Sequence, residues 1–155
     1  AFDSDFSKGT VVGGIFENIG SQGGGDGIDV SGSEVTVTNS SFENISDKGI
    51  SVGENSNMRA NEINIKATDI GVASKDGSRL FLSNSNLTGI KKAGLMAYIK
   101  KAEYGPAEII AKNLEFNSTD QHAVVQKENK ISIDGIEVLP TDLDVEKLYF
   151  TSDNL

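Results

Sequence analysis

The sequence predicts an all-β protein, a single-stranded right-handed parallel β-helix (a solenoid) of five to six coils with about 22 residues per coil. Gly27, Gly49 and Gly71 recur at intervals of 22 residues, and a constant period of this length is typical of solenoid proteins. Apolar residues also recur at fixed offsets, alternating with polar residues as in a strand that has one buried face.

The register of the coils is set by Ser33, Ser56 and Ser78, which end the first turn of each coil. Apolar residues follow two, four and nine residues after each serine: Val35, Val37 and Phe42, then Met58, Ala60 and Ile65, then Leu80, Leu82 and Leu87. The same template continues as Ile109, Ala111 and Phe116 and as Ile131, Ile133 and Val138, and runs backward to Val11 and Phe16. Strands this short must pair with the same strand one coil away, at about 4.8 Å per coil. Connections between parallel strands are right-handed, which gives the predicted hand.

Polar residues that favour turns gather where the chain bends between strands. They are Asn39, Ser40, Ser41, Asn61, Asn64, Asn84, Ser85, Asn86 and Asn113. Asparagine tolerates left-handed backbone conformations, and stacked asparagines form ladders of amide hydrogen bonds. We therefore expect these residues to serve the architecture rather than a ligand.

The regular spacing is interrupted once inside the rod. From Gly94 to Ala123, which we take as its counterpart in the next coil, there are 29 residues, and the excess lies in residues 98–106. Insertions in repeat proteins leave as loops, and such loops often carry function. Residues 1–140 are predicted to form the β-helix, and residues 141–155 a tail of the same domain that caps its open end.

The amino-acid composition excludes several classes of binding partner and metal site. The formal net charge is −9 and the pI about 4.5, which argues against nucleic acid and anionic membrane surfaces as partners. There is no cysteine, hence no disulfide and no thiolate metal site, and no apolar run long enough for membrane insertion. We expect an extracellular or cell-surface bacterial protein.

Acidic residues and one lysine flank the first two glycines of the repeat. Asp26, Asp29, Asp47 and Lys48 would lie together on the outer face of two adjacent coils, and they are the candidate catalytic residues. Carboxylates so placed would act as acid and base or bind calcium through oxygen ligands. A solvated face of paired charges is the competing interpretation. No other metal or cofactor is predicted.

A second candidate set is a strip of mixed charge beside the inserted loop. Its members are Lys48, Glu54, Lys75, Asp76, Tyr98, Lys100, Lys101 and Tyr104. Tyrosine rings stack on sugars while neighbouring charges bond hydroxyl groups, so this strip is the candidate ligand-binding surface. A salt-bridged ladder between coils is the competing interpretation.

The repeat over residues 10–138 resembles those of the pectate-lyase-like superfamily. Within it, residues 26–30 (DGIDV) and 47–52 (DKGISV) are similar to segments of the polygalacturonases, inverting glycoside hydrolases that use aspartates as acid and base. The resemblance places Asp26 and Asp47 at the family's aspartate positions, while Lys48 stands where the family has a second aspartate. The G-H-G and R-I-K motifs of that family are absent. Segments such as DKGISVGENS resemble β-helix domains of bacterial surface or secreted proteins more closely than they resemble the polygalacturonases.

The function expected from these features is a non-catalytic structural or carbohydrate-binding domain. The first alternative is a lyase or glycoside hydrolase acting on polysaccharide, and the second is an adhesin or filament module. The expected partners are polysaccharide or neighbouring protein domains, and end-to-end or side-by-side self-association is a further expectation.

Overall fold

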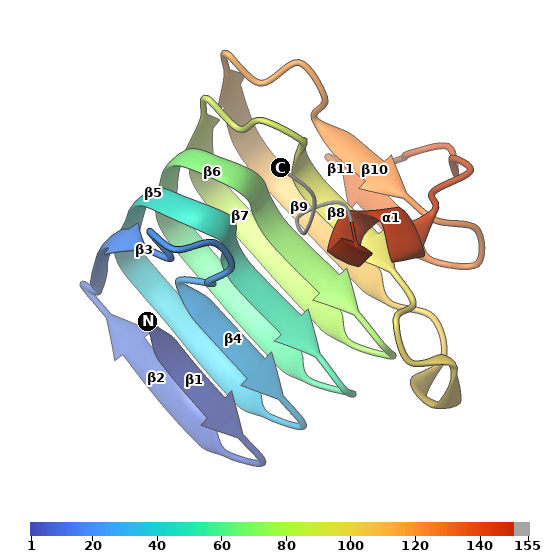
Figure 1. Cartoon of the computed structure of the whole chain (residues 1–155), viewed down its shortest axis with the longest axis horizontal. Helices are drawn as coiled ribbons and strands as arrows, with labels where there is room; N and C mark the ends of the chain where they lie inside the picture. Colours follow the sequence, from blue (N-terminus) through green and yellow to red (C-terminus); the bar gives the residue numbers. More distant parts are fainter. Residues whose placement is uncertain (151–155) are drawn as a thin grey trace.

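The computed structural model describes residues 1–150 and confirms the parallel β-solenoid. It has about six turns of ~23 residues each, with 64% of the chain in strands and 5% in helix. The coils stack side by side along one axis, with the N-terminal strands at one end (Figure 1).

The strands are β1 (Phe2–Asp5), β2 (Lys8–Val12), β3 (Ile15–Ile19), β4 (Ile28–Ser31), β5 (Glu34–Gly53), β6 (Asn57–Lys75), β7 (Arg79–Thr88), β8 (Ala93–Tyr98), β9 (Glu108–Asn117), β10 (Ala123–Val125), β11 (Lys130–Ile133) and β12 (Ile136–Glu137). A 3-10 turn, η1 (Ala102–Tyr104), lies in the inserted loop, and helix α1 (Val145–Phe150) lies in the tail.

Three faces run along the rod. The first face consists of β1, β4, the last residues of β5 and β6, β8 and β10, all parallel. The second face consists of β2, the first residues of β5 and β6, β7, β9 and β11. The third face begins at β3 and continues through the middle of β5 and β6. β5 and β6 each pass from one face to the next as one long strand, and their register shifts once, between Ile45 and Lys48.

The corner between the second and third faces is made by one left-handed residue per coil. Asn39 (φ 48°), Glu62 (φ 57°), Asn84 (φ 50°) and Asn113 (φ 53°) occupy it. The predicted amide ladder is present: Asn84 Nδ2 donates to Asn61 Oδ1 at 2.7 Å, and Asn113 Nδ2 donates to Asn84 Oδ1 at 2.8 Å. The asparagines therefore serve the architecture, as expected.

The core follows the predicted register. Val35, Val37, Phe42, Ile65 and Leu82 are buried, whereas Val11 and Phe16 in the first coil are partly buried and pack against this core. The 22-residue glycine period has a steric cause. A Cβ atom on Gly27 would lie 2.6 Å from the carbonyl oxygen of Gly49, and one on Gly94 would lie 2.7 Å from the carbonyl oxygen of His122. The chain passes too close to the next coil there for a side chain.

The last coil departs from the predicted register in two ways. Ala123 pairs with Leu95, so His122, and not Ala123, is the counterpart of Gly94. Val138 does not continue the template, because β12 turns back and pairs antiparallel with β11, and the Val138 N–H donates to the Ile131 carbonyl at 2.8 Å. The sequence does not reveal that His122 is the counterpart of Gly94, because a loop is inserted before it and no glycine marks the position.

The tail lies mainly along the side of the rod rather than across its end. Leu143, Val145 and Leu148 pack on outward-facing apolar residues of the first face. Thr141 alone extends the edge of β10, through a parallel bridge to Gln126. β12, which covers the edge of β11, belongs to residues 1–140, so capping of the rod by residues 141–155 stays a prediction. Residues 151–155 lie outside the described residues.

Candidate functional site

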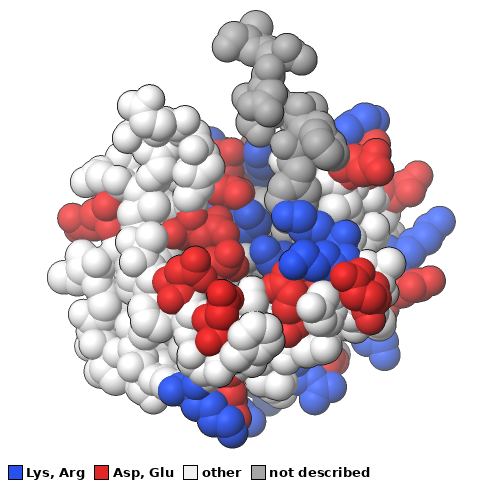
Figure 2. Space-filling model, turned by 60° about the horizontal axis from the view of Figure 1, so that its bottom comes forward, with Lys and Arg blue, Asp and Glu red and all other residues white. Residues whose placement is uncertain are grey.

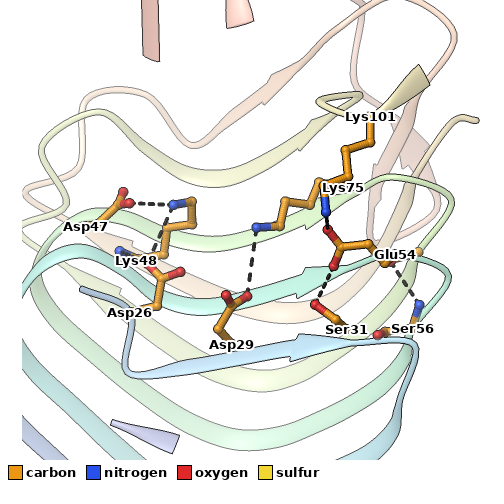
Figure 3. A network of polar contacts seen from close by, with 10 residues as sticks. Asp26, Asp29, Ser31, Asp47, Lys48, Glu54, Ser56, Lys75 and Lys101 are labelled. Carbon is orange, nitrogen blue, oxygen red and sulfur yellow. Dashed lines mark hydrogen bonds and ion pairs between the residues drawn. The ribbon is translucent and has the colours of Figure 1, made fainter. Parts of the chain in front are cut away.

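The candidate site is the outer surface of the first face, where the glycine register brings charged residues of successive coils together. We call Asp26, Asp29, Ser31, Asp47, Lys48, Glu54, Lys75 and Lys101 the outer charged cluster (Figure 3). Figure 2 shows acidic and basic side chains adjoining one another on one side of the molecule. The structure therefore joins the two sets of residues that the sequence suggested separately.

Lys48 lies at the centre of the first part of this cluster, between two carboxylates. Its Nζ is 2.6 Å from Asp47 Oδ2 and 3.5 Å from Asp26 Oδ1. Asp26 Oδ1 also accepts the backbone N–H of Lys48 at 3.1 Å. The residue is only 4% exposed, so this ammonium group is largely withdrawn from water. The ammonium fills the space between the carboxylates.

Asp26 is the carboxylate most affected by this environment. Burial raises the pKa of the Asp26 carboxyl above its ordinary value of 3.8; the charge of Lys48 opposes this shift, and the charges of Asp47 and Asp29 add to it. A carboxyl group with a raised pKa stays protonated to higher pH and is suited to donate a proton.

Lys75 carries the second part of the cluster. Its Nζ lies 3.8 Å from Asp29 Oδ1, an ion pair longer than a hydrogen bond. Ser51 is the neighbour of Asp29 in the parallel register, and its buried hydroxyl has no hydrogen-bond partner among the described residues. The polar groups at the centre of the first face therefore have fewer close hydrogen-bond partners than the polar groups around Lys48.

Glu54 anchors the third part, at the edge of the face. Its carboxylate accepts hydrogen bonds from Lys101 Nζ at 2.6 Å and from the Ser31 hydroxyl. Burial alone would raise the pKa of Glu54, but the hydrogen bonds from Lys101 and Ser31 and the charges of Lys101 and Lys75 outweigh it and lower the pKa. Glu54 is therefore held as an anion and fixes the inserted loop to the rod.

The inserted loop is fastened by Asp76 as well. Asp76 Oδ1 accepts the backbone N–H groups of Lys100 at 2.7 Å and Lys101 at 2.6 Å. Burial and the nearby charges of Lys75, Lys48 and Lys101 lower the pKa of Lys100, which places this residue in a group of basic side chains. Asp76 is fully buried, so its role in the strip is structural.

The two tyrosines of the predicted strip lie in different environments. Tyr98 is fully buried and packs with Ile70, Met96 and Val124, the group that the tail covers, so the position we expected to stack on a sugar is not on the surface. The tail causes this, because Tyr98 does face outward from its strand. Tyr104 ends η1 and is half-buried.

A shallow pocket of about 300 Å³ adjoins Lys48. It is lined by Ala1, Phe2, Asp3, Gly25, Asp26, Asp29 and Asp47. Three of the four candidate catalytic residues thus face one pocket, while Lys48 closes the gap between two of them. The sequence offered no sign of Phe2 or Asp3, because the first strand of the rod lacks the glycine that marks the later coils.

The acidic side chains of the cluster are not arranged as a set of calcium ligands. Among the described residues, no three histidine, cysteine, aspartate or glutamate side chains converge so that they could hold a metal ion. The aspartates of the cluster are directed to Lys48 and Lys75 instead.

Comparisons with known proteins leave the family open. No protein-family model and no curated protein matches the chain. The fold and the site define the protein as a parallel β-solenoid with a charged outer face. Its relationship to the pectate-lyase-like superfamily and its bacterial origin stay predictions. Within residues 1–150, no helix has the length and apolar character needed to cross a membrane.

Proposed function

We propose that this β-solenoid is a non-catalytic domain that binds carbohydrate on its first face, in the pocket beside Lys48. The carboxylates of Asp26, Asp29 and Asp47 are hydrogen-bond acceptors for sugar hydroxyl groups, and the edge of the pocket carries the half-exposed ring of Phe2. The acidic lining favours a neutral or amino sugar over an acidic one.

The observation that supports a non-catalytic role is the position of Lys48. Inverting glycosidases leave room for a water molecule between their two carboxyl groups, and retaining enzymes leave room for the sugar carbon. Here the Lys48 ammonium occupies the space between Asp26 and Asp47 and contacts both. The ammonium offsets one of the two carboxylate charges, and both carboxylates are directed to Lys48.

The second candidate function is hydrolysis or elimination of polysaccharide. The raised pKa of Asp26 favours it, because a carboxyl that holds its proton to higher pH beside the ion pair of Asp47 and Lys48 has the properties of a general acid. This function requires Lys48 to move away when substrate binds.

One experiment separates the two functions. Neutral, amino and acidic oligosaccharides are titrated into the protein with and without calcium, and the release of reducing ends or unsaturated products is followed in the same samples. We expect saturable binding of a neutral or amino oligosaccharide without calcium and without product. Asp47→Asn should weaken the binding about tenfold, the loss of one charged hydrogen bond.

The matched control is Glu43→Gln, which removes a carboxylate that pairs with Lys66 at 2.8 Å on the third face. It should bind as the native protein does. Product formation that Asp26→Asn abolishes would establish the enzyme instead, and absence of binding across the whole panel would contradict the carbohydrate-binding role. An acidic sugar that binds only with calcium would contradict the proposed mode of recognition.

A further inference from the structure

A pocket on the second face shares no residue with the outer charged cluster. We call it the Arg59 pocket. Its volume is about 420 Å³, and its lining includes side chains of β5, β6 and β7, namely Glu34, Thr36, Asn57, Arg59, Arg79 and Phe81. This volume lies near the low end of the roughly 300–1,000 Å³ that is usual for ligand sites. Both arginines of the chain line the pocket, although the chain carries a net charge of −9.

Arg59 is held in place by an aromatic ring. Its guanidinium carbon lies 4.7 Å from the centre of the Phe81 ring, and the two residues are register partners on β6 and β7. A guanidinium that lies over a ring keeps its N–H donors in its own plane, where a carboxylate can accept two of them at once. The contact also orients the side chain before a ligand arrives, which lowers the entropy lost on binding. Arg59 is therefore prepared to receive a carboxylate.

The carboxylate that Arg59 is prepared to receive does not come from the described part of the chain. Glu34 pairs with Lys8 Nζ at 2.8 Å. Arg79 Nε pairs with Glu108 Oε2, also at 2.8 Å. Arg59 forms no ion pair within residues 1–150, and its side chain is exposed. Its charge is therefore open to a ligand.

Apolar side chains continue the row that begins at Arg59. Phe81 and Ile110 are register partners on β7 and β9, and both are half-buried. From Arg59 to Ile110 there are two strand spacings, about 9.6 Å. Three residues of extended chain cover about 10 Å. A segment that crosses these strands can therefore place a carboxylate on Arg59 and, three residues away, an apolar side chain on Ile110.

The charges around the Arg59 pocket limit the class of ligand. Glu34 lines the pocket, and Glu108 is the ion-pair partner of Arg79. A polyanion such as a nucleic acid or an acidic polysaccharide would bring many negative charges against these carboxylates and against a net charge of −9. The face of the Phe81 ring that Arg59 covers is not available for stacking on a sugar. A peptide with one carboxylate near an apolar side chain meets neither obstacle.

We propose that the Arg59 pocket is a docking site for an extended protein segment that carries one acidic residue and, three residues away, an apolar one. The carboxylate of the segment accepts hydrogen bonds from Arg59, and its apolar side chain packs on Phe81 and Ile110. Thr36 and Asn57 line the same pocket and form no side-chain hydrogen bond within residues 1–150, so they are available to the backbone of the segment. This docking site is independent of the proposed carbohydrate pocket, which lies on the first face.

Two glycine–serine peptides serve as probes. One carries a glutamate followed three residues later by a leucine, and the other carries the same two residues in reverse order. Each peptide is titrated at low salt into the isotope-labelled protein, and the amide chemical shifts locate the site. We expect saturable shifts around Arg59, Phe81 and Ile110 with at least one of the two orders. Replacing the glutamate of that peptide by glutamine should weaken binding about tenfold, because a charge-assisted pair of hydrogen bonds is lost.

Arg59→Gln should weaken binding of the glutamate peptide by about the same factor. The matched control is Lys112→Gln, which removes an exposed positive charge from β9 on the same face but outside the pocket, and it should bind as the native protein does. Absence of shifts at the pocket with both peptides would overturn the proposal, as would equal binding of the glutamate and glutamine peptides. Tighter binding of a glucuronate oligosaccharide at the same residues would assign the pocket to an acidic sugar and so overturn the protein partner.

Discussion

Replacing Lys48 by methionine should destabilise the protein strongly, because it removes the charge that compensates two partly buried carboxylates. The Lys48 side chain is 5% exposed, that of Asp26 14% and that of Asp47 34%. Removing one partner of a buried ion pair costs roughly 3–5 kcal/mol, and the partial exposure of Asp47 places this case near 3 kcal/mol. Domains of this kind are stable by about 5–15 kcal/mol, so the loss is a large share of the total.

Urea unfolding followed by far-ultraviolet circular dichroism measures this loss. The matched control is Lys66→Met, since Lys66 pairs with Glu43 at 2.8 Å while its side chain is 61% exposed, and this variant should unfold as the native protein does. The destabilisation by Lys48→Met should shrink as the pH falls through the raised pKa of Asp26, because the protonated carboxyl no longer needs a counter-charge. A loss for Lys48→Met no larger than that for Lys66→Met, or one that does not change with pH, would refute this reasoning.

Three further predictions concern the core, the cluster and the loop. Ile65→Asp places a charge in the core and should cost more than about 4 kcal/mol, which lowers the thermal unfolding temperature by roughly 10 °C or more; native-like stability would show the core register to be wrong. The folded-state pKa of Asp26 is raised, so its contribution to stability is fully present below its ordinary pKa of 3.8 and is lost as the pH rises through the folded-state pKa. The free energy of unfolding of the native protein minus that of Asp26→Asn should therefore fall across this window in urea titrations, and a difference that stays constant with pH would count against the raised pKa. Asp76→Ala should cost about 2 kcal/mol and speed proteolysis within residues 99–106, because two loop N–H groups lose their acceptor; an unchanged cleavage rate would mean that the loop is held by other contacts.

The fold was predictable because its pattern is local and repeated. Val35, Phe42 and Ile65 have fixed offsets from their serines, and each coil supports the assignment of the next. The register failed only in the last coil, where His122 takes the position that Gly71 and Gly94 hold in the two coils before it. Without that glycine, and with a loop inserted just before, the sequence contains no marker for the register there.

The sequence was sufficient to predict which residues of the candidate site lie together, but not how deeply each of them is buried. The glycine register placed Asp26, Asp47 and Lys48 together, and the structure has them in contact. The burial of Tyr98 was not predictable, since the alternation correctly places it outward and only the packing of the distant Leu143 and Val145 covers it. The tail does not follow the repeat, so the spacing of the repeat does not predict which coils the tail contacts.

The contacts that skip a coil have a mechanical consequence. Lys75 pairs with Asp29 and Lys101 pairs with Glu54, each across an intervening coil, and the tail packs on β6, β8 and β10. β1 lies at one end of the rod and α1 on its side near β8 (Figure 1), so a force applied to these two elements also pulls on the packing of the tail. Because these contacts join the coils from β4 to β10 across their neighbours, those coils cannot detach one at a time. A coil of ~23 residues releases about 80 Å of chain at the extended length of each residue. Stretching a single molecule should therefore give one large rupture of the joined coils instead of a series of evenly spaced steps of this length.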